Sequence, residues 1–296
     1  MSRRRISFAL LILAGLLTLA LGVFRFAPLY RLVPHAPRTA AVDALLGARP
    51  VVLAHRGASA DAPENTLSAF RRAAGLGVGF ELDVGLCATG EVIVMHDDTL
   101  ERTTDGSGSI AAATLAELRQ LDAGAWFDEA FAGEPVPTLG EVLDALGGRA
   151  VIDIELKTTE QRAALAEAVV AEIERADVVE RVFVSSFDPF LLAEVRRRNP
   201  AIVRGQLVGS FEGSALAWYE KRALQSLLLN DEARPDLMIV EDEWLSAGWQ
   251  RAMQARGYRV LVWTVNEPAR ARALVERGVD GVISDVPELA RRELSP

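Results

Sequence analysis

Three residue types that build common structural and catalytic sites are scarce in this sequence. Cys87 is its single cysteine, so an internal disulfide, a zinc site of thiolates and a CxxC redox pair are excluded. A lone cysteine is usually a small buried apolar residue, and we expect this of Cys87. The chain has two lysines, Lys157 and Lys221, and three histidines. Because these side chains are so few, their positions are informative.

Positive charge is also in deficit. The chain has 32 Lys and Arg against 41 Asp and Glu. Four arginines lie within residues 1–27 and no acidic residue precedes Asp43, so residues 28–296 carry 28 basic and 41 acidic groups. Affinity for nucleic acid comes largely from Lys and Arg on phosphates, so nucleic acid is excluded as a partner. The composition, with 50% hydrophobic residues, is otherwise that of a globular protein.

Residues 1–26 have the pattern of a membrane anchor or a signal peptide. Three consecutive arginines precede Ile6–Phe24, an uncharged apolar run long enough to cross a bilayer. Ala20-Leu21-Gly22 is alternatively a small-residue cleavage site. Under either hypothesis the remainder is exported: an anchored domain would face the periplasm or the cell surface, and cleavage would give a secreted protein. Residues 27–48 are expected to be a linker, in which His35 has no predicted role.

From residue 49 onward, short apolar runs alternate with amphipathic stretches. Eight strands alternating with helices predict a (β/α)8 TIM barrel over residues 49–296. A doubly wound sheet is the competing arrangement, but no Gly-x-Gly-x-x-Gly follows any strand. The expected strands are Val51–Ala54, Phe80–Val84, Val151–Leu156, Val182–Ser186, Ile202–Leu207, Leu237–Val240, Val260–Thr264 and Gly281–Ser284. The expected helices are 66–76, 160–177, 188–198, 214–229, 245–255 and 267–277.

A ninth apolar run, Val92–Met95, follows the second strand too closely for a parallel crossover. We therefore predict a hairpin over residues 80–96, with a tight turn at Thr89-Gly90. With this turn, the two residue numbers of each pair across the hairpin add up to about 179, so His96 is expected opposite Asp83. Residues from about 85 to 140 are then a small insertion after the second strand.

Acidic residues occupy one face of two predicted strands. Strand side chains alternate, so Glu81 and Asp83 share a face, and Asp153, Glu155 and Lys157 share a face of the next barrel strand. Carboxylates are disfavoured in strands and costly when buried alone. Two such strands indicate a hard divalent cation held by oxygen ligands. The alternative is a pair of buried ion-pair networks in which Lys157 neutralises Glu155 or Asp153.

Two of the three histidines end predicted strands beside these carboxylates. His55 ends the first strand and His96 ends the hairpin arm, positions that suit a general acid and a general base working near neutral pH. Arg56 follows His55, and its guanidinium matches the oxygens of a phosphate or carboxylate. A cation, two histidines, Arg56 and Lys157 around one barrel mouth predict a site that hydrolyses an anionic ester.

These residues stand in sequence motifs whose order resembles that of a known protein family. The motifs are His55-Arg56-Gly57, Pro63-Glu64-Asn65-Thr66, Glu81-Leu82-Asp83-Val84, His96-Asp97, Ile154-Glu155-Leu156-Lys157, Ser185-Ser186-Phe187, Trp263-Thr264-Val265-Asn266 and Gly278-Val279-Asp280-Gly281-Val282-Ile283-Ser284-Asp285. Across residues 50–290 this set is similar to the glycerophosphodiester phosphodiesterase family. The resemblance implies a TIM barrel with a small insertion after its second strand.

The resemblance also implies roles for individual residues. One divalent cation, Ca²⁺ or Mg²⁺, would be bound by the residues that match the family's metal ligands, Glu81, Asp83 and Glu155. The matches to the acid–base pair are His55 and His96. Arg56 and Lys157 match the family's residues that contact the substrate phosphate. Trp263 matches a residue that packs against the substrate; the alternative is that it is a core aromatic residue.

The expected activity is hydrolysis of a small glycerophosphodiester to an alcohol and sn-glycerol 3-phosphate. Two alternatives stay open. One is a phospholipase D-like hydrolysis of lysophospholipids or sphingolipids, which a membrane tether would suit. The other is a tethered, non-catalytic protein that binds phosphodiesters. A wide apolar groove beside the mouth would favour a lipid substrate, and a closed polar pocket would favour deacylated diesters.

Overall fold

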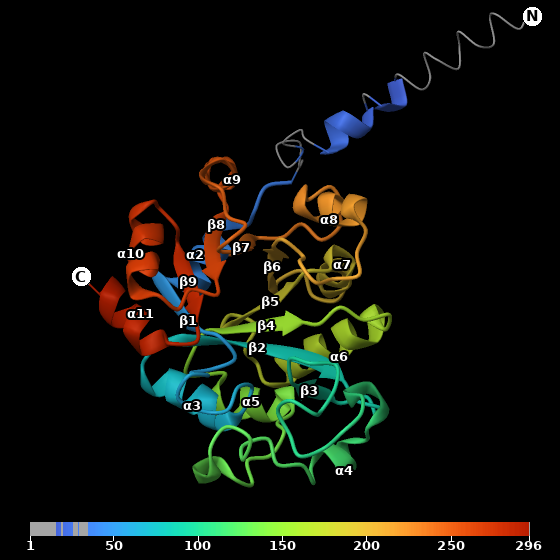
Figure 1. Ribbon diagram of the computed structural model, residues 1–296, viewed down its shortest axis with the longest axis vertical. Coiled ribbons are helices and arrows are strands. Elements are labelled where there is room, and N and C mark those ends of the chain that lie inside the picture. Colours follow the sequence, from blue (N-terminus) through green and yellow to red (C-terminus); the bar gives the residue numbers. More distant parts are fainter. Residues whose placement is uncertain (1–15, 19, 26–28, 30–34, 296) are drawn as a thin grey trace, which may run out of the picture.

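Eight parallel strands close into a barrel in the computed structural model, which describes residues 16–18, 20–25, 29 and 35–295 (Figure 1). The ring is closed by β1 (Val51–Ala54), which pairs with both β2 (Gly79–Leu86) and β9 (Gly281–Ser284). The TIM barrel predicted from the sequence is confirmed. The remaining barrel strands are β4 (Ile152–Leu156), β5 (Val182–Ser186), β6 (Val203–Val208), β7 (Leu237–Glu241) and β8 (Arg259–Trp263).

Helices cover the outside of the barrel. In β2 the outward side chains Phe80, Leu82 and Val84 are fully buried beneath the helices. Stacking of Phe70 on Phe80, with ring centroids 4.7 Å apart, joins α3 to β2. The helices are α3 (Leu67–Gly75), α5 (Leu139–Leu146), α6 (Arg162–Arg175), α7 (Pro189–Arg198), α8 (Trp218–Gln225), α9 (Ala247–Gln254), α10 (Pro268–Glu276) and α11 (Pro287–Leu294).

Several of these helices differ from the sequence expectation: α5 and α11 lie where no helix was predicted, and α8 is shorter than predicted. The helix expected over 214–229 is shorter: α8 begins after Ala217 and ends at Gln225, because Leu227 adopts a left-handed conformation with φ of 57°. Helix α11 had not been expected. It packs against β1 and β9, so it covers the seam where the barrel closes.

The insertion after the second strand begins with the predicted hairpin. Strand β3 (Val92–Val94) pairs antiparallel with β2, but the register differs by one residue from the expected one, and the amide of Met95, not of His96, donates to the Asp83 carbonyl at 3.0 Å. The cause is the turn. Cys87 pairs with Glu91 around a three-residue loop in which Gly90 has φ of 94°, instead of the expected two-residue turn.

The rest of the insertion forms a small second core. It contains η2 (Ile110–Ala112), α4 (Leu115–Leu118) and η3 (Glu129–Phe131). Cys87 is 5% exposed and packs in this core with Ile93 and Leu118, as its expected apolar role requires. The insertion therefore has its own apolar support beside the barrel mouth.

The segment expected as a linker is partly structural. Residues 39–46 of the range 27–48 form helix α2 (Thr39–Leu46), whose Val42, Leu45 and Leu46 are buried against the barrel interior. The amino-terminal end of a barrel exposes an apolar interior, and α2 covers it. Just before α2, the Arg38 guanidinium binds the Asp236 carboxylate at 2.7 Å, which fixes the chain under the barrel.

The predicted anchor or signal peptide, residues 1–26, lies largely outside the described residues. The described pieces 16–18 and 20–25 are helical. Within the part of the chain that the structure describes, no helix has the length and apolar character needed to span a bilayer. The anchor and the cleaved signal both stay predictions.

Candidate active site

The side chains singled out in the sequence converge at the carboxyl ends of the barrel strands. A cavity of about 80 Å³ lies there, lined also by Asp153, Phe187, Leu207 and Ile283. Asp83 lies beside the cavity, 3.2 Å from the Lys157 ammonium. Seven of the eight predicted residues line the cavity itself, namely His55, Arg56, Glu81, His96, Glu155, Lys157 and Trp263.

Three carboxylates form the floor of this site. In the register of β2 and β4, Asp83 lies opposite Glu155, and alternation places Glu81 on the same inner face. Ligand oxygens of Glu81, Asp83 and Glu155 all lie within 4.8 Å of one another, so this group could hold a metal ion. Oxygen-only ligands of this kind suit Ca²⁺ or Mg²⁺.

Glu81 is the member of this group whose charge is least compensated by protein. It is 3% exposed, and its Oε1 has no hydrogen-bond partner among the described residues. Burial, together with the charges of Asp83, Glu155 and Asp153, raises the pKa of Glu81 well above its usual value. An unpartnered buried oxygen among like charges is the environment that a bound cation relieves, so these residues fit a divalent metal.

Lys157 forms buried ion pairs with part of the acidic cluster, which the sequence analysis gave as the alternative to a metal site. Its ammonium lies 3.0 Å from Glu155 Oε1 and 3.2 Å from Asp83 Oδ1. Burial opposes ionisation of Asp83, but Lys157, His96 and Arg56 hold the pKa of that carboxyl below its usual range. Lys157 therefore pairs with two of the three carboxylates and leaves Glu81 unneutralised.

Arg56 lies at the side of the cavity in an uncommon backbone conformation. Its φ is 55°, and in this geometry its amide donates to Glu81 Oε2 at 2.7 Å. Its guanidinium binds Glu64 Oε1 at 2.8 Å and lies 3.5 Å from Asp83. The guanidinium atom that faces Asp83 is Nε, which is buried and has no hydrogen-bond acceptor in the described part of the chain.

Each site histidine is held by its own carboxylate. His55 Nδ1 lies 2.7 Å from Asp285 Oδ1, and His96 Nδ1 lies 2.6 Å from Asp97 Oδ1. Burial opposes ionisation of Asp285, but hydrogen bonds from His55, Asn266 and Ser59 lower the pKa of Asp285 to about 2. A hydrogen bond from Arg102 is the main cause that lowers the pKa of Asp97 to about 2. Both carboxylates are thus charged near neutral pH and fix Nδ1 as the protonated ring nitrogen.

Several residues of the site had no role in the sequence analysis. Asn65 donates to Asp83 Oδ2 at 2.8 Å and orients that carboxylate. Arg102, from the insertion, joins Asp97 to Glu64 through contacts of 2.6 to 2.8 Å. Asn65, Glu64, Asp97 and Asp285 stand within the quoted motifs, which is a signal for them. Arg102 follows no pattern in the sequence, since the path of the insertion alone brings it here.

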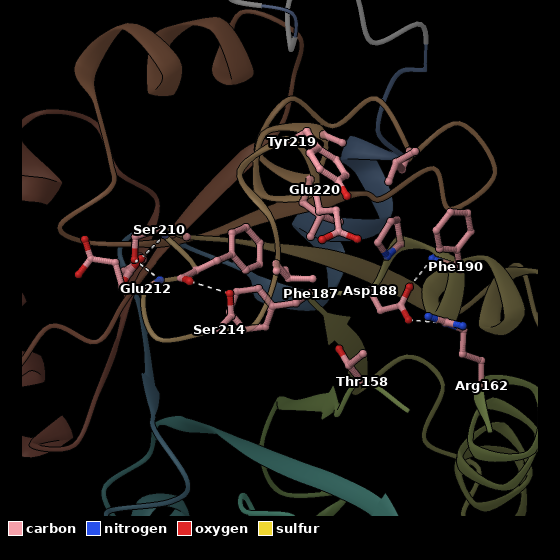
Figure 2. A pocket seen from close by; sticks show the side chains of 18 of the residues that line it. Thr158, Arg162, Phe187, Asp188, Phe190, Ser210, Glu212, Ser214, Tyr219 and Glu220 are labelled. Carbon is pink, nitrogen blue, oxygen red and sulfur yellow. Dashed lines mark hydrogen bonds and ion pairs between the residues drawn. The ribbon is translucent and has the colours of Figure 1, made fainter. Parts of the chain in front are cut away.

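A second, larger cavity adjoins the first. It has a volume of about 850 Å³ and shares Phe187 and Trp263 with the small cavity. Figure 2 shows this larger cavity, with Phe187 among the side chains that line it. Trp263 lies at the boundary of the two, and its indole Nε1 has no hydrogen-bond partner within the described chain. The wide groove that would favour a lipid substrate is therefore present beside the mouth.

A parallel barrel with charged groups at the carboxyl ends of its strands is typical of enzymes, and cationic side chains beside carboxylates and paired histidines suit a phosphoric ester hydrolase. The comparisons with known proteins agree with this class. The model of the glycerophosphoryl diester phosphodiesterase family matches residues 55–289. The chain belongs to this family.

Curated and solved relatives cover most of the chain. It is 35% identical over 241 residues to a glycerophosphodiester phosphodiesterase of Caldanaerobacter subterraneus subsp. tengcongensis, covering 80% of this chain and 95% of that protein. The corresponding enzyme of Bacillus subtilis is 32% identical over 257 residues, covering 81% and 85%. An Oleispira antarctica phosphodiesterase, solved with its product sn-glycerol-3-phosphate, is 31% identical with a TM-score of 0.74, covering 86% of this chain and 98% of that one.

Proposed function

We propose that this protein hydrolyses glycerophosphodiesters to an alcohol and sn-glycerol 3-phosphate. The observation that carries the proposal is the convergence, around one cavity of about 80 Å³, of an acidic cluster, two cationic side chains and two histidines. Membership of the family and the product held by the Oleispira antarctica relative support the same substrate class.

Glu81, Asp83 and Glu155 would hold one divalent cation, Ca²⁺ or Mg²⁺. When bound, the cation supplies positive charge that polarises the phosphoryl group and stabilises the additional negative charge of the transition state. Lys157 keeps Asp83 and Glu155 oriented through its contacts of 3.2 and 3.0 Å.

The protein's own side chains bind the phosphate and move the protons. Arg56 and Lys157 line the cavity and neutralise the phosphate oxygens, and the ring of Trp263 packs against the substrate. Of the two histidines, we assign His55 as the base and His96 as the acid. Fixed with Nδ1–H toward their carboxylates, both present Nε2 for proton transfer.

In the proposed reaction one bond to phosphorus forms and one breaks. A nucleophilic oxygen, from water or from the substrate's own adjacent glycerol hydroxyl, forms a bond to phosphorus while its proton passes to His55. The phosphorus–oxygen bond to the departing alcohol breaks, and the alkoxide takes a proton from His96. With the glycerol hydroxyl as nucleophile, a cyclic phosphate forms first and water opens it.

The test measures sn-glycerol 3-phosphate release from glycerophosphoethanolamine by the full chain with Ca²⁺, with Mg²⁺ and with EDTA. We expect release with at least one cation, loss in EDTA, and loss in His55→Ala and His96→Ala. His35→Phe is the matched control, because the third histidine lies outside the site. Release that survives EDTA or both histidine substitutions would contradict the mechanism. Binding of the diester without release would support the non-catalytic alternative.

We also propose that the catalytic domain works outside the cytoplasm, either tethered by residues 1–26 or secreted after their cleavage. The arginines before the apolar run Ile6–Phe24 support this orientation. Cell fractionation with amino-terminal sequencing distinguishes the two: an intact amino terminus in the membrane fraction identifies the anchor, and a new amino terminus near residue 22 identifies a signal peptide. Recovery of the intact chain in the cytoplasm would contradict both.

A further inference from the structure

Arg102, from the insertion, lies between two carboxylates that each hold a different part of the site. Its Nε and Nη2 donate to Asp97 at 2.6 and 3.1 Å, and its Nη1 and Nη2 donate to Glu64 at 2.7 and 2.8 Å. All three guanidinium nitrogens are therefore used, in two bidentate pairs. Bidentate pairs fix the plane of a carboxylate as well as its distance. Arg102 thus holds both carboxylates in fixed orientations relative to each other.

Asp97 connects Arg102 to the histidine assigned as the acid. Its Oδ1 accepts from His96 Nδ1 at 2.6 Å and from Arg102 Nη2 at 3.1 Å. Because the guanidinium fixes the plane of this carboxylate, it also fixes the direction in which the imidazole ring points. The position of His96 Nε2, the atom that would give up the proton, therefore depends on Arg102.

Glu64 connects Arg102 to the arginine assigned to the phosphate. Its Oε1 accepts from Arg56 Nη1 and from Arg102 Nη2, each at 2.8 Å. Burial opposes ionisation of Glu64, but the hydrogen bond from Arg102 and the charge of Arg56 lower its pKa. One charged carboxylate is thus shared between two guanidinium groups. Without Arg102, both oxygens of Glu64 would be open to Arg56, and the substrate phosphate would compete with a complete carboxylate for that guanidinium.

The insertion fixes the backbone around Arg102. Leu100 is 4% exposed and packs with Leu118 in the small second core. The Leu100 amide donates to the Gly108 carbonyl at 3.0 Å, and the Leu100 carbonyl accepts from the Thr104 hydroxyl at 2.7 Å. The Arg102 side chain extends from this base to the barrel mouth and is 44% exposed. The insertion therefore has a rigid support from which one side chain reaches the site.

We propose that Arg102 is a positioning residue that holds two reacting groups in one arrangement. Through Asp97 it orients His96, the acid. Through Glu64 it orients Arg56, the phosphate ligand. This inference rests on the proposed function and gives the insertion a part in it. An ion pair exposed to water adds little to the free energy of unfolding, so a purely structural Arg102 would be nearly dispensable. A misplaced acid or phosphate ligand slows a reaction far more.

The experiment compares Arg102→Gln and Arg102→Lys with the wild-type full chain on two substrates. One is glycerophosphoethanolamine, whose alcohol must be protonated as it leaves. The other is the glycerophosphodiester of p-nitrophenol, which leaves as a stable anion. Arg119→Gln is the matched control, because Arg119 also belongs to the insertion and pairs with Glu141, but it does not line the catalytic cavity.

In Arg102→Gln we expect kcat for the ethanolamine diester to fall about 10- to 100-fold, because the acid is misdirected. The loss on the nitrophenyl diester should stay within about threefold, since that alcohol needs no proton. KM should rise equally on both, because Glu64 then draws Arg56 away from the phosphate. Arg102→Lys should stay at least about threefold below wild type, because an ammonium group cannot form two bidentate pairs. The unfolding midpoint should change by less than about 4 °C, and Arg119→Gln should match wild type in kcat and KM.

A double-mutant cycle tests whether Arg102 acts through His96. In the His96→Ala background, Arg102→Gln should lower kcat by less than about twofold further, because the group that it positions is already absent. The dependence of the loss on the leaving alcohol should be the same in Arg102→Gln and in His96→Ala. A full additional loss in the double variant, a dependence on the alcohol unlike that of His96→Ala, or a wild-type kcat in Arg102→Gln would overturn the inference.

A measurement on the histidine ring protons separates this inference from the proposed function. If the wild-type protein cleaves no diester, the proposed function fails, and exchange of the His96 Nδ1 proton with water, followed by nuclear magnetic resonance, tests Arg102 alone. That proton should exchange faster in Arg102→Gln than in wild type or Arg119→Gln. The Nδ1 proton of His55, held by Asp285, is the internal reference and should not change. Equal exchange at His96 in all three proteins would refute the inference.

Discussion

Asp285→Asn tests whether the proton on His55 is positioned by its carboxylate. Asp285 Oδ1 accepts from His55 Nδ1, and its Oδ2 accepts from Asn266 Nδ2 at 2.6 Å. The Asn266 amide cannot rotate freely, because its Oδ1 accepts from the Asp285 amide at 2.9 Å and from the Ser284 hydroxyl at 3.2 Å. An asparagine at position 285 must therefore turn its oxygen toward Asn266 and its NH₂ toward His55.

This orientation puts the wrong hydrogen-bonding group opposite the imidazole. An NH₂ group can only donate, so Nδ1 of His55 must accept and the ring proton moves to Nε2. A protonated Nε2 cannot take a proton from the nucleophile. Loss of the correct histidine tautomer in a comparable triad costs about 10⁴-fold in kcat. Because Asp285 is 35% exposed and water can enter, we expect about 10²- to 10⁴-fold here, or about 3–5 kcal/mol in activation free energy.

The assay is kcat for sn-glycerol 3-phosphate release, with the thermal unfolding midpoint as a check on folding. The double variant Asp285→Asn/Asn266→Asp is the decisive control. With a carboxylate at position 266, the NH₂ of the asparagine introduced at position 285 turns toward it, and the amide oxygen faces His55 again. The correct tautomer returns, and we expect at least tenfold recovery over the single variant.

Two results would refute this reasoning. One is a single variant that keeps more than a third of wild-type activity, because the tautomer would then not matter. The other is a double variant no more active than the single one while both remain folded, because the loss would then come from the missing charge and not from the position of the proton.

Three further predictions concern metal binding and stability. Glu81→Gln should weaken cation binding by at least about tenfold by calorimetry, yet raise the unfolding midpoint in EDTA, because burial beside other carboxylates raises the pKa of Glu81 and its charge opposes folding. Leu46→Ala should lower the free energy of unfolding by about 2–5 kcal/mol in denaturant titrations, because Leu46 is buried under the barrel. Burial lowers the pKa of His35 to about 4, so the protein should lose up to about 3 kcal/mol of stability as the pH falls from 6.5 to 4, and His35→Phe should abolish that loss in thermal melts.

Each of these predictions has a clear opposite result. An unchanged cation affinity in Glu81→Gln would exclude Glu81 as a ligand. A loss below about 0.5 kcal/mol in Leu46→Ala, the size of an ordinary surface substitution, would mean that α2 does not cover the barrel in solution. A parallel fall in stability of wild type and His35→Phe between pH 6.5 and 4 would assign the acid sensitivity to other groups.

The sequence by itself determined the barrel and the composition of the site floor. Alternation of side chains along a strand is a local steric property, so the shared face of Glu81 and Asp83 and that of Glu155 followed from spacing alone. The carboxyl ends of parallel strands meet at one rim, which is why His55 and Lys157 could be expected near these carboxylates. Scarcity of histidine and lysine strengthened both inferences.

Tertiary structure decided which groups complete the site and what lies beside it. The partner of His55 is Asp285, 230 positions later, because closure of the barrel sets β1 against β9. The three-residue loop moved the hairpin register by one residue, and the fold of the insertion delivered Arg102 to Asp97. The cover formed by α2 and the groove beside Trp263 likewise depend on loop paths and on surfaces that meet only after closure, and no local pattern in the sequence encodes either.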